Sequence, residues 1–197
     1  MSDAVHEAVT RLIIKGRDVV EDGWLVLRPA EPVEGAPAID PATLTVPEGK
    51  IIVPQSLWLV QRERLAARAA AGEIGVWIAS DERPEALKDD LPQLALIAVD
   101  FPKFTDGRGY SIAYNLRVRL GWAGELRAIG DVLRDQLFQM RRVGFDAYAV
   151  RADRDIHDAL KGLSDFSETY QASVDQKVPL FRRHARPAPG DVGTAGT

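Results

Sequence analysis

The chain has 197 residues, of which 46% are hydrophobic and 27% charged, a composition typical of one soluble globular domain rather than a disordered protein. It contains no cysteine, which excludes disulfides, thiol nucleophiles and cysteine-ligated zinc or iron–sulfur sites. The formal net charge of −4 argues against general nucleic-acid binding, and the longest apolar run, residues 94–99, is too short to cross a membrane.

Basic residues are concentrated in one part of the chain. Residues 101–151 hold nine lysines and arginines against five acidic residues, whereas the rest of the chain holds sixteen against twenty-four. This local excess suits a small anionic ligand or an acidic partner surface, although arginines that only solvate helix faces would give the same count. The first twenty residues are interrupted by charges and lack the apolar core of a secretory signal, so a cytoplasmic location is expected.

The first 50 residues are expected to form a β-hairpin and a proline-rich loop that pack on the main domain. Two short β-rich runs, residues 12–14 and 24–27, are separated by a segment ending in Asp22-Gly23, a dipeptide that favours tight hairpin turns. Five prolines and two glycines between residues 29 and 49 oppose regular structure and predict a surface loop.

Residues 51–176 show the alternation of strands and helices that is typical of a parallel α/β domain. Runs that are apolar on both faces predict strands in a parallel sheet covered by helices: residues 51–53, 74–79, 94–99, 126–129 and 147–150. The last four runs alternate with helical spacing and amount to four consecutive βα units, which form either half a barrel or a doubly wound sheet. Residues 177–197, rich in proline and glycine, are expected to be a flexible tail.

Capping residues predict where the helices begin and end. Ser56 is expected to cap a helix that stops near Gly72. Asp131 is expected to cap the helix that follows the third of the four strands, with Gly144 as its stop, and Asp153 is expected to cap the next helix.

One loop carries most of the chemical groups that could bind a ligand. In parallel α/β proteins, ligands bind beyond the carboxyl ends of the strands, where loops and helix N-termini converge. The loop after the second of the four strands opens onto a helix and contains Lys103, Asp106, Arg108, Tyr110 and Ser111. Glycines on both sides of Arg108 would let the backbone approach a phosphate or a sulfur oxyanion, which the guanidinium could clamp. The same segment would also suit a tight turn in which Asp106 or Ser111 caps the helix and Arg108 points into water.

Residues at the neighbouring strand ends extend this candidate anion site. Asp131 and Arg134 follow the third strand and complete the primary set. Secondary candidates lie in or just beyond the strands: Asp100, Arg127 and Arg151. Arg127 lies inside a strand on the face opposite its apolar neighbours, so it must either pair with Glu125 or face a ligand. No metal-ligand cluster is visible, and residues 107–112 match a dinucleotide-binding fingerprint only weakly.

Three long segments resemble an uncharacterised bacterial family whose members are labelled oxidoreductases involved in sulfite reduction. These segments are residues 100–111 (DFPKFTDGRGYS), 124–138 (GELRAIGDVLRDQLF) and 144–148 (GFDAY). The resemblance extends from the N-terminal hairpin to about Arg151. Members of the family often have a cysteine where this chain has Val143, which argues against a mechanism that relies on a thiol there.

The resemblance implies two classes of function. In the first, the protein is an accessory of assimilatory sulfite reduction that binds a small anion or sulfite reductase itself. In the second, it is an oxidoreductase of sulfur assimilation that acts with a bound nucleotide or a phosphate-bearing cofactor. The absence of cysteine and of a convincing nucleotide fingerprint favours the accessory role. Neither the sequence nor the resemblance identifies a cofactor, a catalytic residue or an oligomeric state.

Overall fold

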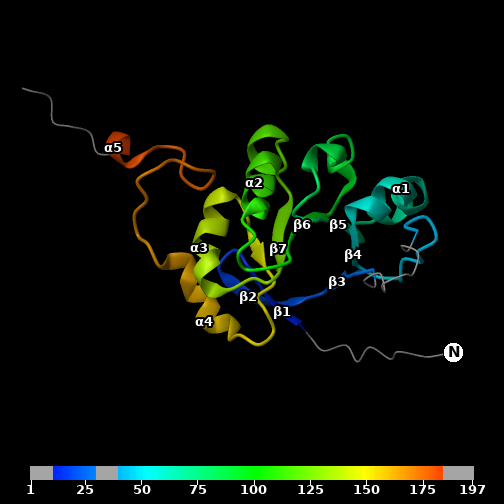
Figure 1. Cartoon of the computed structure of the whole chain (residues 1–197), viewed down its shortest axis with the longest axis horizontal. Coiled ribbons are helices and arrows are strands. Elements are labelled where there is room, and N and C mark those ends of the chain that lie inside the picture. The colour runs from blue at the N-terminus through cyan, green and yellow to red at the C-terminus, as the bar shows by residue number, and fades with distance from the viewer. Residues whose placement is uncertain (1–10, 30–39, 184–197) are drawn as a thin grey trace, which may run out of the picture.

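The centre of the molecule is one eight-stranded sheet with the strand order β2-β1-β8-β7-β6-β5-β4-β3 (Figure 1). The computed structural model describes residues 11–29 and 40–183, so part of the proline-rich loop and most of the expected tail lie outside the described residues. From β3 to β8, strands adjacent in the sheet are consecutive in the chain and run parallel. This sequential order is that of a half-barrel, because a doubly wound sheet reverses its strand order in the middle.

The strands and helices alternate along the chain much as the apolar runs predict. The strands are β1 (Arg11–Lys15), β2 (Asp18–Asp22), β3 (Leu25–Val26), β4 (Ile51–Pro54), β5 (Ile74–Ile78), β6 (Leu96–Phe101), β7 (Glu125–Gly130) and β8 (Ala147–Tyr148). The α-helices are α1 (Gln55–Ala70), α2 (Arg108–Tyr114), α3 (Arg134–Val143), α4 (Ile156–Lys161) and α5 (Leu180–Arg183). Between them lie the 3-10 helices η1 (Pro84–Leu87), η2 (Leu91–Gln93) and η4 (Gly162–Ser164), and the π-helical turn η3 (Asn115–Arg119) that continues α2.

Helices cover the convex face of the sheet. The main hydrophobic core lies between the sheet and these helices. Alternate strand residues such as Val76, Val99 and Leu126 point into this core, where they meet helix side chains such as Trp58 and Leu137. Figure 1 shows α1 to α4 arranged around the outside of the sheet. The connection from β5 to β6 holds two 3-10 helices in place of the α-helix that a full βα unit would supply. None of the helices in the described residues is long and apolar enough to span a bilayer.

The opposite, concave face is closed by the N-terminal segment. β2 forms one edge of the sheet and β3 the other, yet only Gly23 and Trp24 connect them. Two residues cannot span more than about 11 Å between the flanking Cα atoms, so the sheet must curl until its edges approach each other. Trp24 packs against the small cluster of buried residues on this concave face: Ile52, Leu96, Ala98 and Ile129.

The N-terminal hairpin is present, but its turn and its second strand differ from the prediction. β1 pairs with β2 through the turn at Gly16-Arg17, where Gly16 has a φ of +63°. The Asp22-Gly23 dipeptide instead begins the crossing to β3, which pairs in parallel with β4 at the far edge. The prediction was wrong because residues 24–27 find a partner distant in sequence, which a local turn rule does not see.

Three predicted helix caps are also wrong. α1 begins at Gln55 after Pro54, without a side-chain cap from Ser56. Asp131 does not cap α3, which begins at Arg134. The Gln136 side chain accepts the Leu133 N–H at the start of this helix. The cap of α4 is Asp155 and not Asp153. The Asp155 side chain accepts backbone N–H groups of the first turn of the helix. The predicted stops at Gly72 and Gly144 hold, since both glycines have positive φ, +73° and +112°.

Candidate functional site

The carboxyl ends of the parallel strands form a rim that gathers several of the residues predicted from the sequence. At one side of this rim Arg28, just after β3, bonds to Asp100 near the end of β6 at 2.6 Å. The Arg28 guanidinium also lies over the Trp77 ring, 5.5 Å from its centroid. Asp100 is buried, and its charge is matched by a cation from a distant part of the chain. This side of the rim is therefore internally paired.

Arg108 is paired with Asp106 within its own loop. The Arg108 Nη2 lies 2.7 Å from Asp106 Oδ2 and 2.8 Å from the hydroxyl of Ser80, which follows β5. The Asp106 carboxylate also accepts the Arg108 backbone N–H, so it closes the turn before α2. Hydrogen bonds from the Arg108 side chain, then from Ser80, hold the pKa of Asp106 well below its usual range. The arrangement resembles the tight turn that the sequence also allowed, except that the guanidinium folds back onto the carboxylate.

One of the two glycines beside Arg108 has a packing role. A Cβ on Gly109 would lie 2.6 Å from the Phe101 ring, closer than side-chain carbons approach one another. A Cβ on Gly107 would meet nothing within 4 Å. The close approach of α2 to β6 thus explains Gly109 without a ligand. The Tyr110 ring packs edge-on against Phe101 at 5.5 Å, and burial, together with the nearby charge of Asp135, raises the pKa of Tyr110.

Asp131 links the loop of Arg108 to the end of the sheet. Its carboxylate accepts the Phe104 backbone N–H at 2.9 Å and the Arg151 Nη1–H at 2.9 Å. Arg151, which follows β8, also bonds to Asp153 at 2.6 Å. Arg108 and Asp131 therefore belong to one rim, but their side chains bond to different partners.

Four other predicted residues lie apart from this pairing. Arg134 points to the outer layer, where it bonds to Asp158 at 3.0 Å and to Asp165 at 3.3 Å. Lys103 and Ser111 are exposed, and Lys103 has no carboxylate within 4.0 Å among the described residues. Arg127 lies inside the sheet and not at the rim.

The predicted pairing of Arg127 with Glu125 is confirmed, and a second carboxylate joins it. The Arg127 guanidinium is 2% exposed and lies 2.7 Å from Glu125 and 2.8 Å from Asp22 at the end of β2. Lys15 bonds to the other side of Glu125 at 2.8 Å. Burial raises the pKa of Glu125, but the hydrogen bond from Lys15 and the attraction of Arg127 outweigh it, so that pKa is lowered.

Two cavities of the described residues lie away from Arg108. One, of about 430 Å³, lies at the amino end of the sheet between the β1–β2 turn, β8 and the segment after α4. The other, of about 390 Å³, lies between the starts of α3 and α4 and is lined by Arg134 among others. Within the part of the chain that the structure describes, no three histidine or acidic side chains gather as metal ligands would.

Sequence reasoning did not identify the residues of the first cavity. Its arginines come from three separate segments: Arg17, Arg141 and Arg183. The one local signal is the Arg141-Arg142 pair, but cations in the last turn of a helix such as α3 also complement the helix dipole, so the pair does not by itself indicate a site.

Comparison with known proteins shows the family of this chain. Residues 75–181, from β5 to α5, match the family model described as "bacterial protein of unknown function (DUF934)". No curated protein and no solved structure matches the chain. The match covers more than half of the 197 residues and includes β5 to β8 with the rim loops that follow them. The chain therefore belongs to the bacterial family DUF934.

Proposed function

We propose that this protein is an accessory of assimilatory sulfite reduction that binds sulfite reductase through residues 165–183, here called the C-terminal arm. The process comes from the family resemblance of the rim segments. The mode of action is supported by the surface of the arm, which carries the most exposed aromatic side chains among the described residues. The family match extends into the arm, to residue 181, so the arm belongs to the domain that defines the family.

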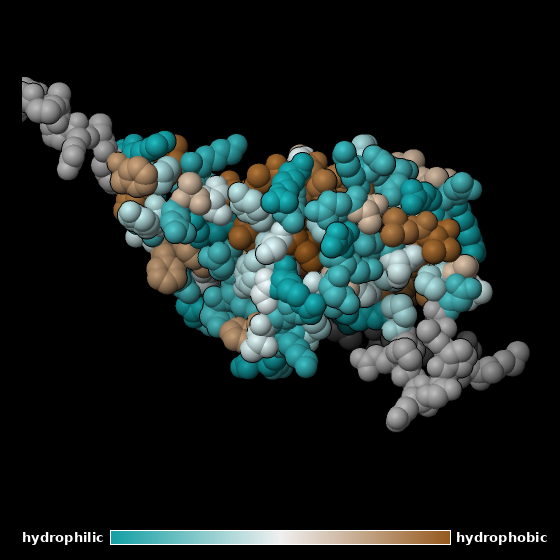
Figure 2. Space-filling view, turned by 45° about the horizontal axis from the view of Figure 1, so that its top comes forward, coloured by the Kyte–Doolittle hydropathy of each residue, from teal (hydrophilic) through white to brown (hydrophobic). Residues whose placement is uncertain are grey.

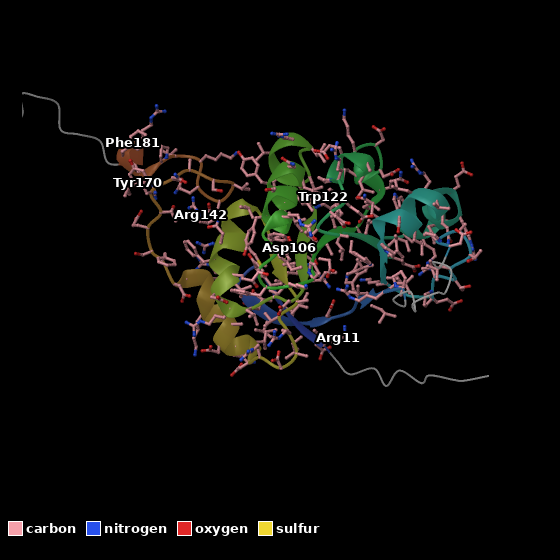
Figure 3. All side chains as sticks on the ribbon, in the orientation of Figure 1. Arg11, Asp106, Trp122, Arg142, Tyr170 and Phe181 are labelled. Carbon is pink, nitrogen blue, oxygen red and sulfur yellow. The ribbon has the colours of Figure 1, made fainter. Side chains whose placement is uncertain are left out.

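The observation that carries this proposal is an exposed aromatic pair at the tip of the arm. Tyr170 is 68% exposed and Phe181 is 63% exposed, and their ring centroids are 6.4 Å apart. Figure 3 shows both residues far from the sheet, and Figure 2 shows hydrophobic side chains on the surface of this end of the molecule. Large aromatic side chains contribute most of the binding energy in many protein interfaces, and a cluster left in water is typical of such a surface.

The tip of the arm is held in a defined conformation by bonds within the arm. The Leu180 N–H donates to the Tyr170 carbonyl at 3.1 Å. Arg183 bonds to Glu168 at 2.9 Å and to the Thr169 carbonyl. A surface that is ordered before binding loses less conformational entropy when a partner covers it.

The arginines of the rim are already paired with carboxylates, and this favours binding of a partner protein by the arm over binding of an anionic substrate at the rim. Arg28, Arg108 and Arg151 each bond to a carboxylate of this chain at 2.6–2.9 Å. An incoming anion would have to displace that carboxylate from the guanidinium. The displaced carboxylate would then lie next to the anion, and the two negative charges would repel each other.

Co-purification and growth test the proposal. The tagged protein is expected to retain sulfite reductase, and the double variant Tyr170→Ser/Phe181→Ser is expected to lose it with an unchanged melting temperature. Val60→Ser, which removes a side chain 58% exposed on α1, serves as the matched control and should retain the enzyme. A deletion strain should grow poorly on sulfate and normally on cysteine. Retention by the double variant, or normal growth of the deletion strain on sulfate, would refute the proposal.

A second candidate function is binding of a small anion at the rim by Arg108 and Lys103. Its support is that the Arg108 side chain is 60% exposed and its partner Asp106 lies in the same loop, so an anion could compete for the guanidinium. Arg108→Ala should then abolish binding of sulfite, sulfate or phosphate in calorimetry without lowering the melting temperature. Unchanged binding would remove this site. The oxidoreductase alternative, with a bound nucleotide or a phosphate-bearing cofactor, is tested by an absorption spectrum of the purified protein, because a bound flavin or nicotinamide would support it.

A further inference from the structure

The 430 Å³ cavity at the amino end of the sheet has the composition of a binding site for a small molecule. Its size lies within the range of about 300–1,000 Å³ that is usual for such sites. Three parts of the chain enclose it: the β1–β2 turn, the segment from the end of α3 into β8, and the C-terminal arm. The residues that line it include aromatic and charged ones: Phe145, Tyr148 and Phe166, with Arg17, Arg141, Arg183, Asp146 and Asp175.

The positive charge around this cavity is only partly neutralised. Asp146 already bonds to Arg117 at 2.8 Å outside the cavity lining. Asp175 is shared between Arg141 at 3.9 Å and Arg142 at 3.7 Å. Both distances exceed hydrogen-bond length, so one carboxylate faces two guanidinium groups without a hydrogen bond to either. Arg183 is paired with Glu168 at 2.9 Å, so the arginines of the lining that lack a close carboxylate among the described residues are Arg17 and Arg141. At the rim, by contrast, Arg28, Arg108 and Arg151 each hold a carboxylate at 2.6–2.9 Å.

Three guanidinium nitrogens in this region have no acceptor among the described residues. They are buried atoms of Arg141 (Nε), Arg142 (Nη1) and Arg183 (Nε). More than nine in ten buried polar groups in proteins have a hydrogen-bond partner, so three unpartnered donors in one region mark guanidinium groups whose hydrogen bonds the protein satisfies only in part. The Arg142 side chain is 9% exposed and is anchored through its other nitrogen to the Gln171 carbonyl of the arm. Arg141 and Arg183 line the cavity itself.

We propose that this cavity binds a tetrahedral oxyanion, a phosphate or sulfate group, either free or esterified to a small organic molecule. The guanidinium group matches such oxygens because it offers planar, forked N–H donors. An ester would place its carbon skeleton against Phe166, the exposed aromatic residue of the lining. The site is distinct from the candidate anion site at the rim, and it does not depend on binding of sulfite reductase by the arm.

Isothermal calorimetry with three probes tests the site: inorganic phosphate, sulfate and adenosine monophosphate, each at constant ionic strength with sodium chloride as the blank. At least one probe is expected to bind with one-to-one stoichiometry. Arg141→Gln and Arg17→Gln should each weaken that binding about tenfold or more, because each removes a charged donor to the anion. Arg108→Gln removes the same charge at the rim and should leave the affinity unchanged. Tighter binding of the nucleotide than of both inorganic anions would identify an ester as the ligand.

Two results would overturn the proposal. The first is no measurable heat with any of the three probes up to about 10 mM, a concentration that reveals even millimolar affinity. The second is binding that is lost in Arg108→Gln and retained in both cavity variants, which would place the anion at the rim. Arg17 is exposed and has no ion pair among the described residues, so Arg17→Gln is expected to fold normally. Anion binding by Arg17→Gln therefore decides the outcome if Arg141→Gln is destabilised. If the Tyr170→Ser/Phe181→Ser variant loses sulfite reductase but still binds the anion, the result supports both proposals and shows that the two sites act independently.

Discussion

Replacing Arg127 with methionine is expected to lower the free energy of unfolding by about 3–5 kcal/mol, the usual cost of breaking a buried ion pair. Methionine fills much of the same space with an apolar chain, so the loss of charge is the main change. The substitution leaves Asp22, whose side chain is 5% exposed, without its ion-pair partner. Glu125, 12% exposed, keeps only Lys15. Two carboxylates would then remain buried in the sheet with half of their compensating charge.

The pH dependence separates this electrostatic cost from a packing defect. In the native protein the pKa of Glu125 is lowered from its ordinary value of 4.5, so its ionisation stabilises the fold above that pH. This contribution is lost as the pH falls through the lowered pKa. Without Arg127, the burial of Glu125 is less compensated and its ionisation contributes less. The difference in unfolding free energy between native protein and variant should therefore be largest near neutral pH and shrink below pH 4.5.

Urea unfolding at several pH values measures these differences. At neutral pH the expected loss corresponds to a fall in melting temperature of about 6–20 °C for a domain of this size. Arg134→Met is the matched control, because it breaks pairs of exposed side chains and should cost less than about 1 kcal/mol. Adding Asp22→Asn to Arg127→Met should recover part of the loss. An Arg127→Met variant no less stable than Arg134→Met, or a loss that is independent of pH, would refute the reasoning.

Three further predictions concern the backbone, the core and the rim. Gly130→Ala should lower the free energy of unfolding, measured in urea, by about 2 kcal/mol or more, because φ is +93° and a Cβ would lie 2.4 Å from a backbone oxygen of β6. The control Gly107→Ala places its Cβ in open space and should change that free energy by no more than about 0.5 kcal/mol. Trp58→Phe should cost about 1–3 kcal/mol in the same assay, because the indole donates at 3.0 Å to a buried carboxylate that would lose this bond. Arg108→Gln should raise the pKa of Asp106 toward its ordinary 3.8 in an NMR titration; an unchanged pKa would show that the pair does not persist in solution.

The sequence predicts the parallel strands because their burial leaves a local signal. The runs at residues 74–79 and 126–129 are apolar on both faces, and both are strands of the sheet. The helix stops at Gly72 and Gly144 are equally local, since each needs a residue that tolerates positive φ. The partner of residues 24–27 could not be predicted in the same way, because it lies far along the chain in β4. Asp131 was expected to cap a helix, but it bonds instead to Phe104 and Arg151, which are also distant in sequence.

The candidate site shows the same limit. The rule that ligand groups gather at the carboxyl ends of parallel strands correctly groups Arg108 with Asp131 and Arg151 at one rim. It does not reveal that Arg28 and Asp100, 72 residues apart, neutralise each other there. The cavity at the other end is assembled from three segments and has no motif, so no local pattern indicates it.

The pairing of β1 with β8, the last strand of the sheet to be made, has a consequence for synthesis on the ribosome. β1 and β2 are translated first, but β1 takes its place in the sheet only by pairing with β8, which joins Lys15 to Ala147 across 132 residues. Contacts between such distant parts of a chain form slowly and are typical of late folding steps. The nascent chain therefore exposes an unpaired hairpin while nearly all of the remaining sheet is being made, a period in which its edges are open to other chains.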